Sequence, residues 1–394
     1  MHVRGWIKDV MYGLIIFGIC AALILVVSVA ADNIVAKHNA VIVSKNVNSN
    51  LDCDDSICTS VDNVSGSEND ENVNLACDGK EQDNNNINDK KIACWGDSIT
   101  YGLGGQENTY IKSEAGIIDA SNWNYPDTLR YYTGMDVYNL GVCGETSYEI
   151  ALRQGGIKMY VGKQVTVKPG KRTQISIVDE SGNPVILENF NGYETDNQQP
   201  ENVVYINDIP FKLEYDNSRI YISIYDNAAD KSVKLKKGSQ IITKAAHDIS
   251  GDVLVIQMGS NGGWNDYDEL IEQYKAMIAN SGTECYIIIG DTDNPEESVD
   301  SANYTSGQKI GTDDSMWEAA LREAFGEHFI NMRTYLLENA LNIAGLEPTQ
   351  MDEEDLSQGR VPETIKYDYT HLNSYGYYAI GYGVYEKGLE LGYW

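Results

Sequence analysis

The stretch Ile92–Gly102 reads I-A-C-W-G-D-S-I-T-Y-G and decides how the rest of the chain is interpreted. Its apolar start predicts a β-strand, and the glycine, aspartate and serine that follow predict a turn or the start of a helix. Ser98 is therefore expected at the carboxyl end of a parallel strand, where open α/β sheets bind ligands. A hydroxyl and a backbone N–H at that place suit acyl transfer. Alone, however, a short G-D-S run is ordinary turn sequence.

Three later stretches supply the other groups that acyl transfer from a serine requires. They read N-L-G-V-C-G-E-T-S at Asn139–Ser147, Q-M-G-S-N-G-G at Gln257–Gly263 and D-Y-T-H at Asp368–His371. Together with the stretch around Ser98, they resemble in order and spacing the four sequence blocks of the SGNH hydrolases, also called GDSL-type esterases and lipases. The resemblance extends from about Lys91 to the C-terminus, apart from a long insertion. Four blocks in order are far more specific than any one of them.

The resemblance implies roles for five residues. The serine, glycine, asparagine and histidine of the family correspond to Ser98, Gly144, Asn261 and His371, and an aspartate, Asp368, stands three residues before the histidine. A serine nucleophile needs a base, and an imidazole held by a carboxylate can take and return its proton. We therefore expect Ser98, His371 and Asp368 to form a catalytic triad. The expected oxyanion hole consists of the backbone N–H groups of Ser98 and Gly144 and the side-chain amide of Asn261.

Two neighbouring residues bear on the expected site. Asp97 is expected to fix the turn before Ser98 and to stay outside the triad. Gly262 follows Asn261 at the position where the family most often has aspartate. The oxyanion amide is retained, but the sequence leaves open how the loop of the third block is fixed.

The composition limits the classes of partner. The chain has 394 residues with 29 basic and 59 acidic side chains, which gives a formal net charge of −30. A phosphate backbone is bound by clustered lysine and arginine, so nucleic acid is not an expected partner. Such acidity suits a soluble surface outside the cytoplasm. A hydrophobic content of 42% is sufficient for a substantial core.

The N-terminus predicts a membrane anchor. Residues 10–31 form a run of 22 without a charged side chain, which as a helix would be about 33 Å long and could cross a bilayer. Arg4 and Lys8 precede the run, so the N-terminus is expected in the cytoplasm and the rest outside the cell membrane. The alternative is a cleaved signal peptide, because small residues surround Ala30. In both cases the bulk of the protein lies outside.

The remaining chain divides by composition. Residues 1–31 are expected to be the cytoplasmic stub and anchor, and the Asn-, Asp- and Ser-rich residues 32–89 a solvated linker. Residues 90–394 alternate strands and helices, which predicts a three-layer α/β/α fold with a doubly wound, flavodoxin-like parallel sheet. Its strands are expected at 92–95, 137–140, 253–258, 286–289 and 329–332. Helices are expected to begin near 126, 146, 270, 317 and 373.

An insertion interrupts this pattern between residues 155 and 250. Its segments are rich in Val, Ile, Tyr and Thr and are separated by Gly, Asn, Asp and Pro, which predicts short strands joined by hairpins. We expect a small antiparallel β module. It would serve as a substrate-selecting wall or glycan-binding module over the active site, or only as a structural addition.

Seven cysteines fit an oxidising compartment only loosely. One of them, Cys20, lies in the expected anchor, and the other six allow fifteen pairings. Cys94 and Cys143 lie near the ends of strands expected to be neighbours, so a bridge between them is one hypothesis. Two buried thiols are the favoured alternative. No cysteine or histidine spacing resembles a zinc site, and no cofactor is expected.

The sequence thus predicts a membrane-anchored serine esterase that removes acyl groups, most plausibly acetyl, from a cell-surface or extracellular polysaccharide. Its expected partners are the ester substrate and the membrane. The alternative is a non-catalytic glycan-binding protein on the same scaffold. An α/β-hydrolase does not fit, because Thr100 occupies the last position of the G-x-S-x-G elbow. A metallohydrolase does not fit the five histidines, and a glycosidase needs a carboxylate geometry that sequence does not give.

Overall fold

The computed structural model describes residues 90–113, 116–187, 202–216, 219–294 and 313–394. The expected anchor at 10–31 and the expected linker at 32–89 lie outside these ranges, so both stay predictions. Within the described ranges, no helix combines the length and the apolar character that crossing a bilayer requires.

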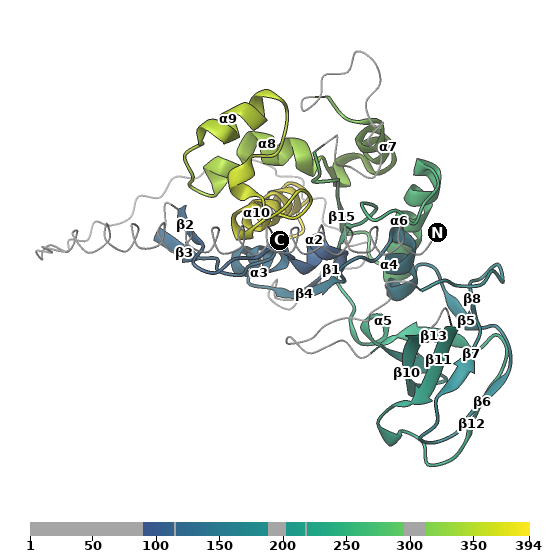
Figure 1. Ribbon diagram of the computed structural model, residues 1–394. Coiled ribbons are helices and arrows are strands. Elements are labelled where there is room, and N and C mark those ends of the chain that lie inside the picture. Colours follow the sequence, from purple (N-terminus) through teal and green to yellow (C-terminus); the bar gives the residue numbers. More distant parts are fainter. Residues whose placement is uncertain (1–89, 114–115, 188–201, 217–218, 295–312) are drawn as a thin grey trace, which may run out of the picture. The chain divides into compact units, whose positions relative to one another are not determined.

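A five-stranded parallel sheet forms the centre of the α/β region (Figure 1). Its strands lie in the order β16-β15-β14-β1-β4, and every neighbouring pair is parallel. By position in the chain this is the 2-1-3-4-5 order of flavodoxin-like sheets, which confirms the predicted doubly wound α/β class. The chain changes winding direction at β1, and ligands bind beyond the carboxyl ends of the strands at such a point. The strands are β1 (Lys91–Gly96), β4 (Asp136–Gly141), β14 (Val253–Gln257), β15 (Tyr286–Ile289) and β16 (Phe329–Ile330).

Helices cover both faces of this sheet. Alternate strand residues, among them Ile92 and Val255, pack against α3 (Tyr125–Thr133), α8 (Met332–Ile343) and α10 (Ser374–Glu390). The residues between them, among them Trp95 and Ile256, pack against α4 (Ser147–Gln154), α6 (Tyr267–Ser281) and α7 (Met316–Phe325). Because strand side chains alternate between faces, two apolar faces require two helical layers.

Local sequence signals set the ends of these helices. The side chains of Asn124, Thr146 and Ser315 each accept a hydrogen bond from the backbone N–H three residues later, and an acidic side chain there bonds back. These capping boxes begin α3, α4 and α7 close to the expected positions. The start of α6 at Tyr267 lies before the expected residue 270, because its first turn, capped by Asp266, is acidic.

The inserted segment forms an antiparallel sheet with its own core. Seven strands lie in the order β7-β11-β10-β9-β13-β5-β8, and β6 pairs with β12 separately. Val204, Phe211 and Ile222 are fully buried in the core of this sheet. Short antiparallel strands were expected here, whereas the boundaries 155 and 250 stay a prediction. The elements are β5 (Met159–Val161), β6 (Val165–Val167), β7 (Thr173–Ile175), β8 (Ile177–Val178), β9 (Val203–Ile206), β10 (Ile209–Asp216), β11 (Arg219–Ile224), β12 (Val233–Leu235), β13 (Gln240–Thr243) and α5 (Lys244–Asp248).

Several elements differ from the sequence-based expectation. The strand expected at 329–332 ends at Ile330, because the side chain of Asn331 caps α8 by accepting a hydrogen bond from Thr334. A β-hairpin and two helices were not expected: β2 (Tyr110–Ser113) with β3 (Gly116–Asp119), α8, and α9 (Gln350–Ser357).

The hypothesis of a bridge between Cys94 and Cys143 was wrong, and the favoured alternative of a buried thiol is confirmed for Cys94, whereas the thiol of Cys143 is half-buried. Cys94 is a free thiol and is fully buried in the core beneath α3. Burial raises the pKa of this thiol far above its ordinary value, although a hydrogen bond with Tyr125 opposes the shift. Cys94 therefore acts as a small apolar core residue.

The buried hydroxyl of Tyr274 holds the segment that follows β14, and removing this hydroxyl tests how much it contributes to stability. The hydroxyl of Tyr274 donates a hydrogen bond to the carbonyl of Met258 at 2.7 Å and accepts one from its N–H at 3.2 Å. Tyr274→Phe should lower the free energy of unfolding by about 1–3 kcal/mol, because both groups of Met258 lose a buried partner. Tyr131→Phe, on a ring that is 52% exposed, should change it by less than about 0.5 kcal/mol. Urea unfolding measures both, and equal midpoints would contradict this account.

Candidate active site

Ser98 is placed by a tight turn at the carboxyl end of β1. The strand ends at Gly96, and the side chain of Asp97 accepts a hydrogen bond from the N–H of Ile99 at 3.0 Å. Asp97 thereby caps the short helix α2 (Ser98–Tyr101), as expected of a residue that fixes the turn. A side chain at Gly96 would overlap Thr100 and the carbonyl of Gln257, so only glycine permits the turn to pack on β14.

A line of hydrogen bonds joins Ser98 to the fourth sequence block. The Oγ atom of Ser98 lies 2.9 Å from Nε2 of His371. The other ring nitrogen, Nδ1, lies 2.9 Å and 3.0 Å from the two carboxylate oxygens of Asp368. The structure thus brings together, across 273 positions of sequence, the three residues expected to form the triad.

The loop that carries His371 is held by its own hydrogen bonds. A carboxylate oxygen of Asp368 accepts the backbone N–H groups of Thr370 at 2.9 Å and His371 at 2.7 Å. The N–H of Tyr367 donates to the carbonyl of His371 at 2.8 Å and closes the turn. Asn373 then caps α10, so the loop is fixed at the point where it meets the helix.

The charge on Asp368 suits an orienting carboxylate. Burial by itself would raise the pKa of Asp368, but hydrogen bonds from the backbone and ring of His371 and from the N–H of Thr370 outweigh it. The pKa of Asp368 therefore lies below its ordinary value. An ionised carboxylate can hold the imidazole in one orientation and stabilise its protonated form.

The residues expected to form the oxyanion hole lie in turns beside Ser98. Gly144 follows β4 in a turn with a φ of 79°, a value that favours glycine. Asn261 follows β14, and its Nδ2 atom donates to the carbonyl of Glu145 at 3.1 Å and to the carboxylate of Asp97 at 3.4 Å. The amide of Asn261 is therefore tied to the residue after Gly144 and to the residue before Ser98.

The third sequence block, Gln257–Gly263, is held in place although Gly262 stands where the SGNH hydrolases that it resembles usually have aspartate. The carbonyl of Gly262 accepts hydrogen bonds from the backbone N–H and the hydroxyl of Ser147, both at 3.0 Å. Gly263 lies against Thr146, where an added side-chain carbon would come within 2.7 Å of its Cβ. The start of α4 therefore holds the loop that carries Asn261.

Sequence reasoning missed a buried ion pair beneath this site. Nε of Arg153 lies 2.9 Å and 2.8 Å from the two carboxylate oxygens of Glu145, and neither side chain is exposed. Nη2 of the same guanidinium donates to the carbonyl of Leu140 at 2.8 Å and reaches the carbonyl of Gly96 at 3.4 Å. The ring of Trp95 lies 5.0 Å away below it. The guanidinium of Arg153 thus joins the ends of β1 and β4 to the turn beside Gly144. No sequence motif or periodicity indicated this ion pair.

A second buried carboxyl, that of Asp97, lies next to Ser98. Burial raises the pKa of Asp97 to about 7, the N–H of Ile99 opposes the shift and the charge of Asp291 adds to it. Asp97 therefore changes its charge near neutral pH.

Within the described ranges, no cluster of three or more histidine, cysteine, aspartate or glutamate side chains is placed to hold a metal ion.

The geometry defines a class of site: a serine hydroxyl, an imidazole and a carboxylate lie in hydrogen-bonding contact at the switch point of a doubly wound sheet, an arrangement that serine hydrolases use. No family model and no curated protein matches the chain.

Comparison with solved structures found matches at low identity. One is a protein from Desulfitobacterium hafniense DCB-2 that is assigned to the lipolytic G-D-S-L family, with 11% identity over 76% of this chain and 99% of that chain, at a TM-score of 0.35. Another is a carbohydrate esterase family 2 enzyme with a carbohydrate-binding domain from Corynascus thermopiles (Myceliophthora fergusii). It has 13% identity over 77% of this chain and 67% of that chain, at a TM-score of 0.34. These likenesses are loose, and the function proposed below rests on the contacts within this chain.

Removing the buried cation should destabilise the fold strongly. Arg153→Met leaves the carboxylate of Glu145 buried without its partner, which should cost about 3–5 kcal/mol of unfolding free energy. Arg172→Met is a matched control, because Arg172 pairs with Asp216 at 2.6 Å but the two side chains are 41% and 46% exposed. Its cost should stay below about 1 kcal/mol. Similar losses for both variants in urea unfolding would show that the buried pair has no special role.

The raised pKa of Asp97 predicts a pH dependence of stability. Because this pKa lies above the ordinary value of 3.8, the folded protein keeps a proton that the unfolded chain has lost. The group therefore lowers stability as the pH rises from about 4 to 7. Asp97→Asn removes this titration, so its stability relative to the original protein should increase between about pH 5 and 7, by at most about 1.4 kcal/mol per pH unit.

Denaturant unfolding at both pH values tests this dependence. Asp119→Asn serves as the control, because the hydroxyl and N–H of Ser121 lower the pKa of Asp119. This variant should show no such increase. A difference for Asp97→Asn that stays constant or falls with pH would refute the assignment of this titration to Asp97.

Proposed function

We propose that the protein is a serine esterase that hydrolyses carboxylic esters through an acyl-enzyme at Ser98. The observation that carries this proposal is the contact of 2.9 Å between Oγ of Ser98 and Nε2 of His371. A hydroxyl at its ordinary pKa is a weak nucleophile, and this contact puts a base in reach of its proton.

In the first step, Oγ of Ser98 forms a bond to the ester carbonyl carbon while its proton passes to Nε2 of His371. Asp368 stabilises the resulting imidazolium through Nδ1. The negative charge that develops on the carbonyl oxygen would be met by the N–H groups of Ser98 and Gly144 and by the amide of Asn261, which would give up its 3.4 Å contact with Asp97 for this purpose. The ester bond to the alcohol then breaks, and the alcohol leaves with the proton from His371.

The second step regenerates the enzyme. A water molecule gives a proton to His371 and attacks the acyl-enzyme carbonyl, and a second tetrahedral intermediate forms. Its collapse breaks the bond to Ser98, whose oxygen recovers the proton from His371, and the carboxylic acid is released. The same three side chains serve both steps because the imidazole alternates between base and acid.

The substrate proposed is an acetylated polysaccharide at the cell surface or outside the cell. The net charge of −30 and the apolar run at residues 10–31 support an exported, membrane-anchored protein. The inserted antiparallel sheet supports a carbohydrate partner more weakly, since insertions on such scaffolds often set specificity. In this proposal the catalytic region lies outside the membrane.

Replacing the nucleophile tests the proposal. Ser98→Ala should reduce kcat for a short-chain aryl ester by at least roughly a thousandfold, because the acyl-enzyme loses its oxygen. Ser357→Ala, on the exposed face of α9, is the matched control and should keep full activity. Full turnover by Ser98→Ala would refute the esterase. An original protein that binds glycans but neither turns over esters nor reacts with a fluorophosphonate would favour the binding-protein alternative.

A further inference from the structure

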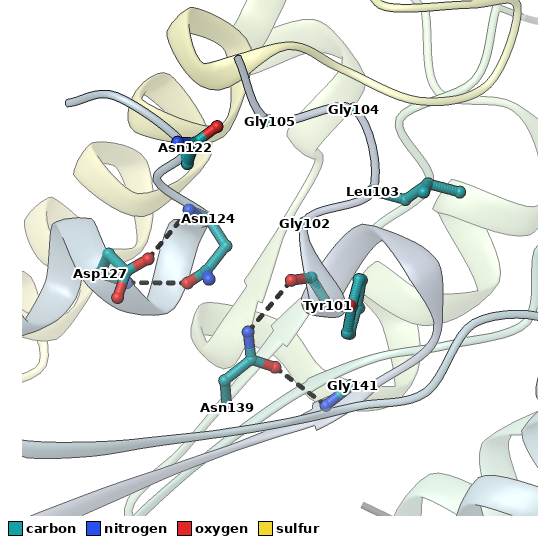
Figure 2. Close-up of a pocket in the computed structure, with 10 residues that line it drawn as sticks. All are labelled: Tyr101, Gly102, Leu103, Gly104, Gly105, Asn122, Asn124, Asp127, Asn139 and Gly141. Atoms are coloured by element: carbon teal, nitrogen blue, oxygen red, sulfur yellow. Dashed lines mark hydrogen bonds between the residues drawn. The ribbon is translucent and has the colours of Figure 1, made fainter. Parts of the chain in front are cut away.

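A polar hollow of about 530 Å³ lies beside the helix that carries Ser98 (Figure 2). It is bounded by the end of α2, the glycine-rich loop that follows, the start of α3 and the carboxyl-terminal half of β4. Pockets of about 300–1,000 Å³ are typical of small-molecule sites. The lining residues are Tyr101, Gly102, Leu103, Gly104, Gly105, Asn122, Asn124, Asp127, Asn139 and Gly141.

The lining favours a neutral polar ligand. It contains no lysine, arginine or histidine, so it offers no cationic side chain to an anion. Its one carboxylate, Asp127, accepts the N–H of Asn124 at 3.1 Å and pairs with Arg130 at 2.5 Å. Leu103 is its one aliphatic side chain, and it points away from the asparagines in Figure 2. A lipid chain would therefore find little apolar surface.

Asparagine amides suit the hydroxyl groups of a sugar. Each amide both donates and accepts, as each hydroxyl does, so one side chain can bond neighbouring hydroxyls. Asn122 has no hydrogen-bond partner for its side-chain amide within the described ranges. Its backbone is fixed, because its N–H donates to the carbonyl of Gln106 at 2.7 Å and its φ is 59°. The amide is thus presented by a defined backbone and remains available to a ligand.

The glycine-rich loop that bounds the hollow also packs against the loop that carries His371. Gly104 packs so closely on the segment of His371 that an added side-chain carbon would lie 2.6 Å from the carbonyl of Leu372 and from Cβ of Tyr367. On the other side, the amide of Asn139 donates to the carbonyl of Tyr101 at 3.2 Å and ties β4 to α2. One loop therefore separates the hollow from the loop of the proposed base.

We infer that this hollow is a subsite for a neutral sugar residue of the substrate, at a distance along the glycan from the residue that carries the ester. The inference rests on the proposed function, and it adds that the substrate is a polyhydroxylated chain held outside the reacting centre. The hollow takes part in binding and leaves the chemistry to Ser98, His371 and Asp368.

The matched variants Asn122→Gly and Asn108→Gly test this inference. Both asparagines have a φ of 59°, so glycine keeps each backbone and deletes only the amide. Asn108 lies outside the hollow. The substrates are 4-nitrophenyl acetate and a panel of partially acetylated xylan, mannan and chitin oligosaccharides. Circular dichroism establishes that each variant is folded.

Asn122→Gly should raise KM for the preferred oligosaccharide about tenfold, the loss expected for one or two hydrogen bonds. Its kcat should remain within about twofold, and both constants for 4-nitrophenyl acetate should stay unchanged. Asn108→Gly should match the original protein on every substrate. An unchanged KM for the oligosaccharide, or an equal loss on both substrate types, would overturn the subsite.

A separate readout distinguishes failure of the subsite from failure of the proposed function. If the original protein hydrolyses no ester, the esterase is refuted, and the hollow is tested by titrating the unacetylated oligosaccharides into Ser98→Ala. Binding that weakens about tenfold on adding Asn122→Gly would support the sugar site without catalysis. Binding that is absent, or that is insensitive to Asn122→Gly, would overturn it.

Discussion

The buried guanidinium of Arg153 is the constraint on which the geometry of this site depends. Removing two charges from water is costly, and a buried pair recovers that cost only with complete hydrogen bonding. Here the pairing with Glu145 is close, yet Nη1 of Arg153 has no partner among the described residues. Such a pair is not optimised for stability alone. Its other bonds, to the carbonyls of Gly96 and Leu140, instead fix the relative positions of two strand ends.

The proposed chemistry depends on the turns that follow β1, β4 and β14, because these turns meet at the ends of the strands. β1 delivers Ser98, β4 leads to the turn of Gly144, and β14 leads to Asn261, whose amide bonds the carbonyl of Glu145. His371 arrives from a separate loop before α10 and completes the line to Ser98. The inserted sheet is joined to the same framework, because the hydroxyl of Thr243 donates to the carbonyl of Arg153 at 2.6 Å.

The sequence predicted the features that depend on local pattern or on recognisable blocks. The central strands were visible as short apolar runs, and their parallel order followed from the alternation with helices. The positions of Ser98, His371 and Asp368 followed from the blocks, and their assigned roles remain the proposal. The pair of Arg153 and Glu145 was not predictable, because the partners of Arg153 on β1 and β4 become neighbours only in the folded sheet. The β2–β3 hairpin was missed because each of its strands is only four residues long, and α9 was missed because its segment is polar. The bridge of Cys94 was the less favoured hypothesis, and it failed because strand proximity does not fix the direction of a side chain.

The central claim is that Ser98 carries the acyl group during turnover, and trapping that intermediate tests it most directly. The protein is mixed rapidly with 4-nitrophenyl acetate, quenched in acid and digested, and the peptide that contains Ser98 is examined by mass spectrometry. The account predicts an acetyl group on Ser98 that forms within the first turnover and disappears as substrate is exhausted. Release of acetate with no acetyl group on Ser98 at any time, or with the acetyl group on another residue, would contradict it.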